Sequence, residues 1–286
     1  MPPEEATAVA ETTSSNDAAS CKGLVKIYWT ATGEVNALTG IDASFPEGAI
    51  TAVVGPSGSG KSSLLRILAA IDRPTAGQVM IGGRDVSSLP AWRRRRVRRR
   101  VVGYMFQRPA DNLIPYLNAY DHLVLAGRLR GGFDPNEADE LLEVVGLTDR
   151  AKHRPHQMSG GEQQRLALAS AAIGKPALVV ADEPTAELDS GSGQALMELV
   201  RSLARRGVTF LSSTHDPIVA AAADRTLYLR HGALEAEADA ERHQARALSV
   251  IDTAGRIQLP PGALRLFPGR RAVITVDEDG VRIDPP

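Results

Sequence analysis

The sequence has a single cysteine and no long apolar run. Cys21 cannot form an internal disulfide, and no Cys/His spacing typical of a bound metal is present among the 286 residues. No apolar run approaches the roughly 20 residues that cross a bilayer, and residues 1–20 lack the basic start and apolar stretch of a secretory signal. We therefore expect a protein that is soluble by itself in a reducing compartment and that reaches a membrane only through a partner.

The sequence also lacks an excess of charge of either sign. Its 33 Lys and Arg side chains nearly cancel its 34 Asp and Glu side chains, so the composition gives no global reason to expect a polyanionic partner. The exception is local: Trp92–Arg100 contains seven arginines. Such a run can bind nucleic-acid phosphates, but a solvated helix face or an anchoring patch for a membrane protein or anionic lipid headgroups is the interpretation that the balanced remainder of the chain favours.

Short apolar runs alternate with helical patterns from Leu24 to Leu229, which indicates an α/β core with a mainly parallel sheet. Three runs are apolar nearly throughout and end in polar residues, as expected of strands covered on both faces: Ile50–Val54, Ala177–Ala181 and Thr209–Ser213. Helical patterns such as Ala138–Val145 and Glu162–Ala172 replace the strands between about 108 and 172. We expect a helical subdomain inserted there.

The two ends of the chain differ from this core. Residues 1–20 have no apolar period and are expected to form a disordered arm ahead of the main domain, 21–234. Residues 235–247 are rich in charge and predict a linker helix. Residues 248–286 return to short strands around Pro and Gly, which predicts a separate small β-rich module.

Gly55–Ser62 gives the strongest functional signal. The sequence GPSGSGKS follows an apolar strand, opens a helical run and fits the pattern G-x-x-x-x-G-K-[ST]. Its glycines permit a tight turn whose N–H groups point at phosphate oxygens, and the helix start adds partial positive charge. Lys61 supplies a charge for the β- and γ-phosphates and Ser62 a hydroxyl for Mg²⁺. The residues expected to bind nucleotide are Gly55, Ser57, Gly58, Ser59, Gly60, Lys61, Ser62 and Ser63.

Polar residues also follow the other two buried strands. Asp182 and Glu183 come directly after Ala177–Ala181, at the edge where open α/β sheets bind ligands. Asp182 is suited to hold Mg²⁺, while Glu183 can polarise an attacking water; capping of the following helix is the alternative. His215, after Thr209–Ser213, can donate a hydrogen bond to a γ-phosphate, although a lone histidine is more often structural.

The glycine loop, the acidic pair and the histidine, taken with the Ser-Gly-Gly turn between them, follow one another along the chain as in the nucleotide-binding domain of ABC transporters, which this sequence resembles. The similarity covers about residues 22–232 and includes Met158-Ser-Gly-Gly-Glu162, similar to the family signature L-S-G-G-Q/E. A Ser-Gly-Gly turn that opens a helix is a second anion site by the same helix-terminus physics. The resemblance implies a P-loop NTPase core with an antiparallel β edge, ATP hydrolysis, and two cassettes that close head to tail, so that Ser159, Gly160, Gly161 and Glu162 grip the ATP of the other subunit.

The resemblance assigns roles to further residues. Tyr28 matches an aromatic that stacks on adenine, and Gln107 matches a loop that senses Mg²⁺ and couples to a membrane subunit. Asp189 matches a loop that communicates between the two sites. Glu183 and His215 match the catalytic base and the switch histidine, which act beside Lys61. The metal site implied is therefore Ser62, Gln107 and Asp182.

Three positions depart from the family pattern. Met158 replaces the usual Leu, a volume-conserving change. Ser170 stands where many relatives carry Arg, and Glu187 occupies a small or amide position near the dimer seam. We expect these changes to affect regulation and not catalysis.

Within the family, the sequence is most similar to the lipoprotein-release, macrolide-export and division-associated group. The stretches that carry this similarity are 33–38, 100–107 and 182–189. That group works with separate permeases, so the resemblance implies a peripheral protein on the cytoplasmic face of the cell membrane. A signalling ATPase that regulates a membrane-bound cell-wall or division complex without transport is the alternative.

The C-terminal segment resembles a different family. Leu248–Pro260, Arg271–Val276 and the Asp279-Gly280 turn are similar to the swapped-hairpin fold of AbrB-like regulators, which is completed when two chains interlock. So short a segment has little core of its own, and we expect it to help dimerise the ATPase, with a hairpin packed on the cassette as the alternative. A DNA-binding role is disfavoured because acidic residues balance the arginines of this tail.

Overall fold

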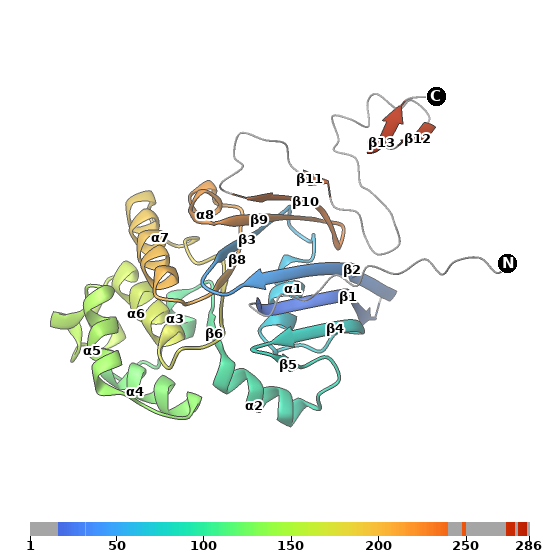
Figure 1. The fold of residues 1–286 in the computed structure, drawn as a ribbon. Coiled ribbons are helices and arrows are strands. Elements are labelled where there is room, and N and C mark those ends of the chain that lie inside the picture. Colours follow the sequence, from blue (N-terminus) through green and yellow to red (C-terminus); the bar gives the residue numbers. More distant parts are fainter. Residues whose placement is uncertain (1–16, 32, 240–247, 250–272, 278–279, 285–286) are drawn as a thin grey trace.

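Two sheets lie on opposite sides of one short helix, α1 (Lys61–Leu68), in the computed structural model (Figure 1). The structure describes residues 17–31, 33–239, 248–249, 273–277 and 280–284. Helix α1 contacts β7 and β8 of the larger sheet on one side and β2 and β4 of the smaller sheet on the other. Its apolar residues Leu64, Leu65, Ile67 and Leu68 are fully buried between the two.

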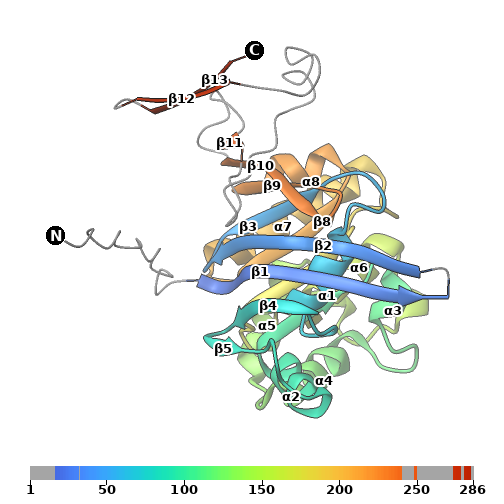
Figure 2. The same ribbon diagram turned by 90° about the vertical axis from the view of Figure 1, so that its right-hand side faces the viewer.

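The smaller sheet is antiparallel. It has the order β2-β1-β4-β5 and consists of β1 (Asp17–Thr30), β2 (Gly33–Pro46), β4 (Ala76–Ile81) and β5 (Arg84–Asp85). Figure 2 shows the long strands β1 and β2 running side by side. This sheet is the antiparallel edge that the family resemblance implied.

The larger sheet has the order β11-β10-β9-β3-β8-β7-β6. Its parallel strands are β3 (Ile50–Val54), β6 (Val102–Met105), β7 (Leu178–Asp182), β8 (Phe210–Thr214) and β9 (Arg225–Arg230), and β10 (Ala233–Asp239) and β11 (Leu248–Ser249) add antiparallel neighbours. Helices cover both faces of the parallel strands, so their side chains are buried on both sides and the sequence is apolar without alternation. The three strands predicted from such runs are confirmed to within one residue.

Helices gather on the face of the larger sheet that α1 does not cover. Residues 109–172 form α3 (Pro109–Asn112), α4 (Ala119–Arg130), α5 (Pro135–Val144) and α6 (Gly160–Ala172), with 3-10 turns at Thr148–Arg150 and Pro155–Gln157. They lie together on one side of the molecule in Figure 1, beside α7 (Ser190–Arg205), and α8 (Pro217–Ala222) follows β8. The inserted helical subdomain is therefore present. Within the described stretches, no helix is both long and apolar enough to cross a membrane.

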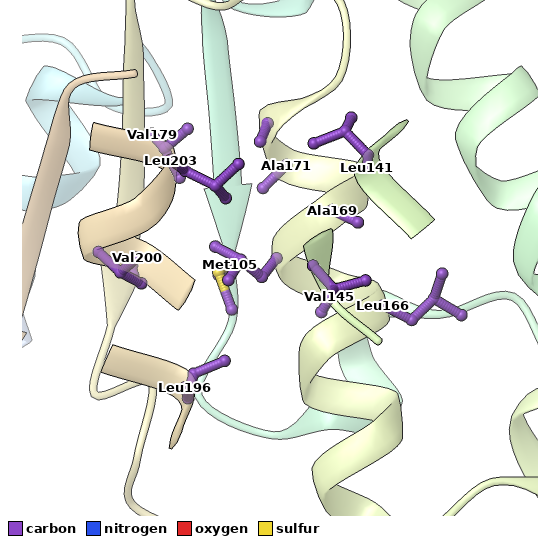
Figure 3. Close-up of a cluster of buried hydrophobic side chains, with 14 of the residues drawn as sticks. Met105, Leu141, Val145, Leu166, Ala169, Ala171, Val179, Leu196, Val200 and Leu203 are labelled. Carbon is purple, nitrogen blue, oxygen red and sulfur yellow. The ribbon is translucent and has the colours of Figure 1, made fainter. Parts of the chain in front are cut away.

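A second core joins this subdomain to the sheet. Figure 3 shows Met105 and Val179 of the sheet between α7, which contributes Leu203, and α6, which contributes Ala171. Caps fix where these helices begin: the Asn118 side chain accepts from Asp121 N at the start of α4, at 2.8 Å.

Two boundaries differ from the sequence prediction. The predicted arm 1–20 ends earlier, because β1 begins at Asp17 and pairs with the end of β2, where Ala19 lies opposite Phe45 and is buried. The predicted linker helix at 235–247 is wrong for its first part, since Glu235–Asp239 belong to β10. The strand is held there by pairing with β9 and by an ion pair between Arg225 and Glu237. Residues 1–16 and 240–247 lie outside the described residues.

The C-terminal segment contains a hairpin. Strand β12 (Val273–Asp277) pairs in antiparallel fashion with β13 (Gly280–Asp284), near the turn expected from the sequence. Residues 250–272, which carry most of the predicted small module, lie outside the described residues, so its likeness to AbrB-like regulators stays a prediction.

Candidate functional site

The polar residues predicted after separate strands lie at one edge of the larger sheet. In the parallel ladder, Val54 of β3 pairs with Thr214 of β8, and Asp182 of β7 pairs with Ser213 of β8. Met105 of β6 pairs with Ala181. Because parallel strands end on the same side, the loop after β3, the Asp182-Glu183 pair, His215 and Gln107 all start from adjacent strand ends.

Glycine is sterically required in the loop 55–60. A Cβ on Gly55 would lie 2.0 Å from the carbonyl oxygen of Leu229 and 2.8 Å from Ser59 Oγ. Gly60 has φ +106°, and a Cβ there would lie 2.4 Å from the carbonyl oxygen of Ala37. The loop is therefore pressed against β2 and β9 and can take its turn only without side chains at these positions.

The polar atoms of this loop fit an anion. Lys61 Nζ donates to the carbonyl oxygens of Gly55, at 2.7 Å, and Pro56, at 3.0 Å, and an ammonium has three donors. The Ser59 hydroxyl is buried and has no hydrogen-bond partner among the described residues. Since α1 begins directly after the loop and has no acidic residue in its first turn, its N-terminal charge is not neutralised there. The loop thus has hydrogen-bond donors, on Lys61, on Ser59 and at the start of α1, that are available to bind an anion.

Asp182 and Glu183 are held by Ser213 of the neighbouring strand. The Ser213 hydroxyl donates to Asp182 Oδ1, and the Glu183 N–H donates to Ser213 O at 3.1 Å. Glu183 has φ +47°, a left-handed conformation that costs a non-glycine residue about 1–3 kcal/mol. The strain turns the chain sharply between the two carboxylates. Strained residues of this kind concentrate at functional sites.

His215 and Glu183 form a pair across the sheet edge. His215 Nδ1 lies 3.1 Å from Glu183 Oε1. The imidazole is 70% exposed and the carboxylate 24% exposed, so the pair sits at the surface with the carboxylate partly covered. The sequence placed these residues after different strands, and the structure brings their side chains into contact.

Gln107 and Asp182 line one cleft of about 350 Å³. Tyr104, Phe106 and Glu187 are also in its wall. Burial and the Asp182 charge raise the pKa of Tyr104 to about 12, so this phenol is neutral at physiological pH. No group of three or more His, Cys, Asp or Glu side chains able to hold a metal occurs among the described residues. A hydroxyl, an amide and one carboxylate are nonetheless the hard oxygen donors that suit Mg²⁺ when phosphates and waters complete its shell.

The Ser159–Glu162 turn starts α6 on the opposite face of the sheet from α1. Ser159 Oγ accepts from Glu162 N at 3.2 Å, and Glu162 Oε2 accepts from Ser159 N at 2.8 Å, which is a capping box. The Ser159 N–H, together with Arg150 3.1 Å from the carboxylate, holds the pKa of Glu162 below its usual range. Neither capping bond uses the N–H groups of Gly160 and Gly161, so they can face an anion.

Asp189 lies beside this turn. Its Oδ1 accepts from Ser192 N at 3.0 Å and its Oδ2 from the Ser192 hydroxyl at 2.7 Å, which caps α7. A Cβ on Gly161 would lie 3.7 Å from Ser192 Oγ, so the starts of α6 and α7 are neighbours. The predicted signature turn and the predicted communicating residue therefore share one surface.

Tyr28 lies on β1 and is half-buried. Its hydroxyl is 3.2 Å from Asp72 Oδ2, and Lys26 Nζ lies 4.7 Å from its ring centroid. Asp72 also pairs with Arg66 at 2.8 Å, and hydrogen bonding to Arg66 lowers the Asp72 pKa. The structure places Tyr28 outside the sheet-edge group, and its stacking role stays a prediction.

Two residues that the sequence analysis missed tie the site together. Gln164, buried in α6, donates from Nε2 to the carbonyl oxygen of Pro184 at 2.7 Å, next to Glu183. The Thr185 hydroxyl donates to Asp216 Oδ2 at 2.7 Å and so joins the loops after β7 and β8. The only sequence signal was the position of Thr185 and Asp216 just after buried strands.

Comparisons with known proteins agree with this arrangement. A family profile described as ABC transporter matches residues 38–186. The chain is 40% identical over 218 residues to the lipoprotein-releasing system ATP-binding protein LolD of Shewanella sp. (strain MR-4), covering 75% of this chain and 94% of that protein. It is 41% identical over 226 residues to the macrolide export ATP-binding/permease protein MacB of Marinobacter nauticus, covering 78% of this chain and 34% of that protein.

A solved structure of an ATP-binding cassette is also similar to this chain. The dimeric ATP-binding cassette MJ0796, in a post-hydrolysis state bound to ADP and Pi, aligns with a TM-score of 0.69 and 34% identity over 78% of this chain and 98% of that one. The phosphate-type loop, the acid–histidine pair at the sheet edge and these matches lead to one conclusion. The chain belongs to the ABC transporter family, as a subunit that binds and hydrolyses ATP.

Proposed function

We propose that this subunit drives a separate transmembrane permease through head-to-tail closure of two cassettes around two ATP molecules. The observation that carries the proposal is that the anion-binding groups fall on two surfaces of one chain. The loop 55–62 lies at the sheet edge, and the Ser159–Gly161 turn starts α6, which packs on the opposite face of the sheet from α1. Two copies can each complete the other's site.

In this proposal, Lys61 and the N–H groups of the loop hold the phosphates, and Tyr28 stacks on the adenine. Bound Mg²⁺ would supply positive charge that offsets the charge developing on the phosphates. Ser62, Gln107 and Asp182 would hold it, and the shared cleft of Gln107 and Asp182 supports that grouping. The Ser213 hydroxyl keeps the Asp182 carboxylate oriented.

Glu183 is the proposed base that polarises the attacking water. Its strained backbone and its contact with His215 fix the carboxylate at the sheet edge. A protonated imidazole donates from both nitrogens, so His215 can hold Glu183 through Nδ1 and a phosphate oxygen through Nε2. Asp189, beside the signature turn, is placed to pass changes from one site to the other.

The membrane partner is inferred from relatives. The proteins named LolD and MacB belong to lipoprotein-release and macrolide-export systems, and this chain matches the LolD protein over 94% of its length. The MacB protein is described as an ATP-binding/permease protein and the match covers 34% of it, so the expectation that this whole group works with separate permeases is wrong for MacB. A separate permease, with this subunit on the cytoplasmic face of the membrane, is therefore the proposed assembly.

We propose further that the C-terminal segment strengthens the dimer. A hairpin as short as β12–β13 has little core of its own, which favours pairing with a second copy. By light scattering without nucleotide, full-length protein should have the mass of a dimer of its chain, and a chain that ends at Asp239 the mass of a monomer. The same oligomeric state in both proteins would remove this role.

Replacing Ser159 by Asp tests head-to-tail closure. Asp caps a helix about as well as Ser, so the fold is kept while a negative charge enters the proposed anion site. We expect Ser159→Asp to bind ATP with unchanged affinity and to hydrolyse it at least about tenfold more slowly, since tenfold corresponds to only ~1.4 kcal/mol. The control is Asn118→Asp, which makes the same kind of change at the cap of α4. Equal turnover in both variants would contradict the proposal.

A further inference from the structure

The helix α2 (Ala91–Val101) presents a strongly basic surface that the ATPase site does not use. Its arginines are Arg93, Arg94, Arg95, Arg96, Arg98, Arg99 and Arg100. Five of them are exposed and two are half-buried. None forms an ion pair with a carboxylate in the part of the chain that the structure describes; Arg94 donates to the carbonyl oxygen of Leu89 at 3.2 Å. We call this set the α2 arginine surface.

Helix stability does not explain the α2 arginine surface. Arginines in the last turn complement the helix dipole, but those in the first turn, such as Arg93, oppose it, and that turn has no acidic residue. Like charges three and four residues apart also repel. Burial, together with Arg95, Arg94 and Arg99, lowers the pKa of Arg98. Helix stability therefore gives no reason for this concentration of charge, and the charge is open to anions from outside the described chain.

Two clefts flank the helix. One, of about 380 Å³, is lined by Arg96, Arg99 and Arg100 of α2 and by Arg128, Leu129 and Gly131 of the neighbouring segment. Four guanidinium groups meet there, and guanidinium binds phosphate oxygens in a bidentate manner. The cleft thus offers four arginine side chains to a phosphate-bearing group.

The second cleft, of about 460 Å³, has an apolar floor. It is lined by Leu89, Trp92 and Val97 together with Arg84, Asp85, Arg93 and Arg96. The half-buried Leu89 and the buried Val97 are what we call its apolar floor. The Asp85 carboxylate already accepts from Gln78 and Ser87. The Trp92 side chain is 61% exposed, and the Arg93 guanidinium lies 4.9 Å from its ring centroid. An exposed indole beside cationic groups is the arrangement that proteins use at the boundary between lipid headgroups and acyl chains.

We propose that the α2 arginine surface binds the headgroups of anionic phospholipids at a membrane surface. The arginine cleft takes the phosphate, while Trp92 and the apolar floor take the glycerol and upper acyl region. This combination fits an amphiphile better than a duplex nucleic acid, whose backbone would need a charged track but no apolar floor. Exposed Leu129, on the α4 side of the arginine cleft, extends the apolar area.

Vesicle flotation with the full-length protein tests the proposal. Vesicles of phosphatidylcholine alone are compared with vesicles that contain one part phosphatidylglycerol to three parts phosphatidylcholine, at about 0.1 M salt. We expect binding only to the anionic vesicles and release at high salt. Each basic residue near an anionic surface changes partitioning about fivefold, so Arg96→Gln/Arg99→Gln should bind roughly 25-fold more weakly. Gln keeps the helix propensity of Arg.

The matched control is Arg205→Gln/Arg206→Gln, which removes two exposed charges at the end of α7. It should bind vesicles like the wild type, and all variants should keep wild-type ATPase activity in detergent-free solution. Trp92→Ala should weaken vesicle binding severalfold, and by the same factor at each salt concentration, because the lost contact is apolar. Equal loss in the two double variants, or no preference for anionic vesicles, would overturn the proposal. Binding to duplex DNA but not to vesicles would replace it with a nucleic-acid surface.

Discussion

The hydrogen bond between Thr185 and Asp216 is expected to stabilise the fold and to align the proposed catalytic pair, Glu183 and His215. The Thr185 side chain is 5% exposed, and its hydroxyl donates to Asp216 Oδ2 at 2.7 Å. Asp216 Oδ1 accepts from Ile218 N at 2.9 Å and caps α8. Valine has the same shape as threonine, so Thr185→Val removes the donor without opening a cavity and leaves a carboxylate oxygen unpaired.

The expected cost follows from that geometry. A hydrogen bond to a charged group contributes about 1.5–3 kcal/mol, so the free energy of unfolding should fall by about 2 kcal/mol. The loops after β7 and β8 carry Glu183 and His215, which lie 3.1 Å apart, and loosening their connection should also lower ATP turnover.

Urea unfolding and steady-state ATPase assays measure both effects. Thr226→Val is the control, because Thr226 is likewise 5% exposed and its hydroxyl, unlike that of Thr51, is not among the fully enclosed unpartnered groups of the described residues. Its stability should stay within about 0.5 kcal/mol of the wild type. If Thr185→Val matched this control in both stability and turnover, the inferred connection between the two loops would be refuted.

Three other changes have defined outcomes. Thr51→Val should raise the free energy of unfolding by about 1 kcal/mol, because the buried Thr51 hydroxyl has no partner among the described residues; a lower urea midpoint would contradict this. Gly60→Ala should abolish ATP binding measured by calorimetry, since its Cβ would meet the Ala37 carbonyl oxygen at 2.4 Å. Burial lowers the pKa of His122, whose Nε2 accepts from Ile114 N at 2.8 Å. When the pH is lowered below the ordinary pKa of histidine, the unfolded chain takes up a proton at His122 that the folded chain does not. The free energy of unfolding should therefore decrease as the pH is lowered through that region, and should decrease less in His122→Gln.

The sequence predicted the central strands well and the edge strands poorly. Strands β3, β7 and β8 are covered on both faces, so their continuous apolar runs had one interpretation. A strand near the edge of the sheet, such as β10 with only the two-residue β11 beyond it, has no such requirement. The charged residues of β10 suggested a helix, and only the tertiary pairing with β9, including the Arg225–Glu237 ion pair, explains why they form a strand.

In the site, too, some features could be predicted from the sequence and others depend on tertiary packing. The positions of the loop residues and of Asp182, Glu183 and His215 follow from motif spacing and from the rule that sites form at the ends of parallel strands. The bonds that hold them could not be predicted. Gln164 reaches Pro184 across 20 positions of sequence and Thr185 reaches Asp216 across 31, and such contacts depend on how α6 and the strands pack.

The most direct test of the central claim is sedimentation velocity of Glu183→Gln with saturating Mg-ATP. Removing the proposed base should leave the nucleotide bound and unhydrolysed, so that the anion-binding surfaces of two copies close on it. The protein should then sediment as a compact closed dimer with trapped ATP. Without nucleotide it should sediment more slowly, as a monomer or as an open dimer joined only through the C-terminal segment. An unchanged sedimentation coefficient with freely exchanging ATP would contradict the account.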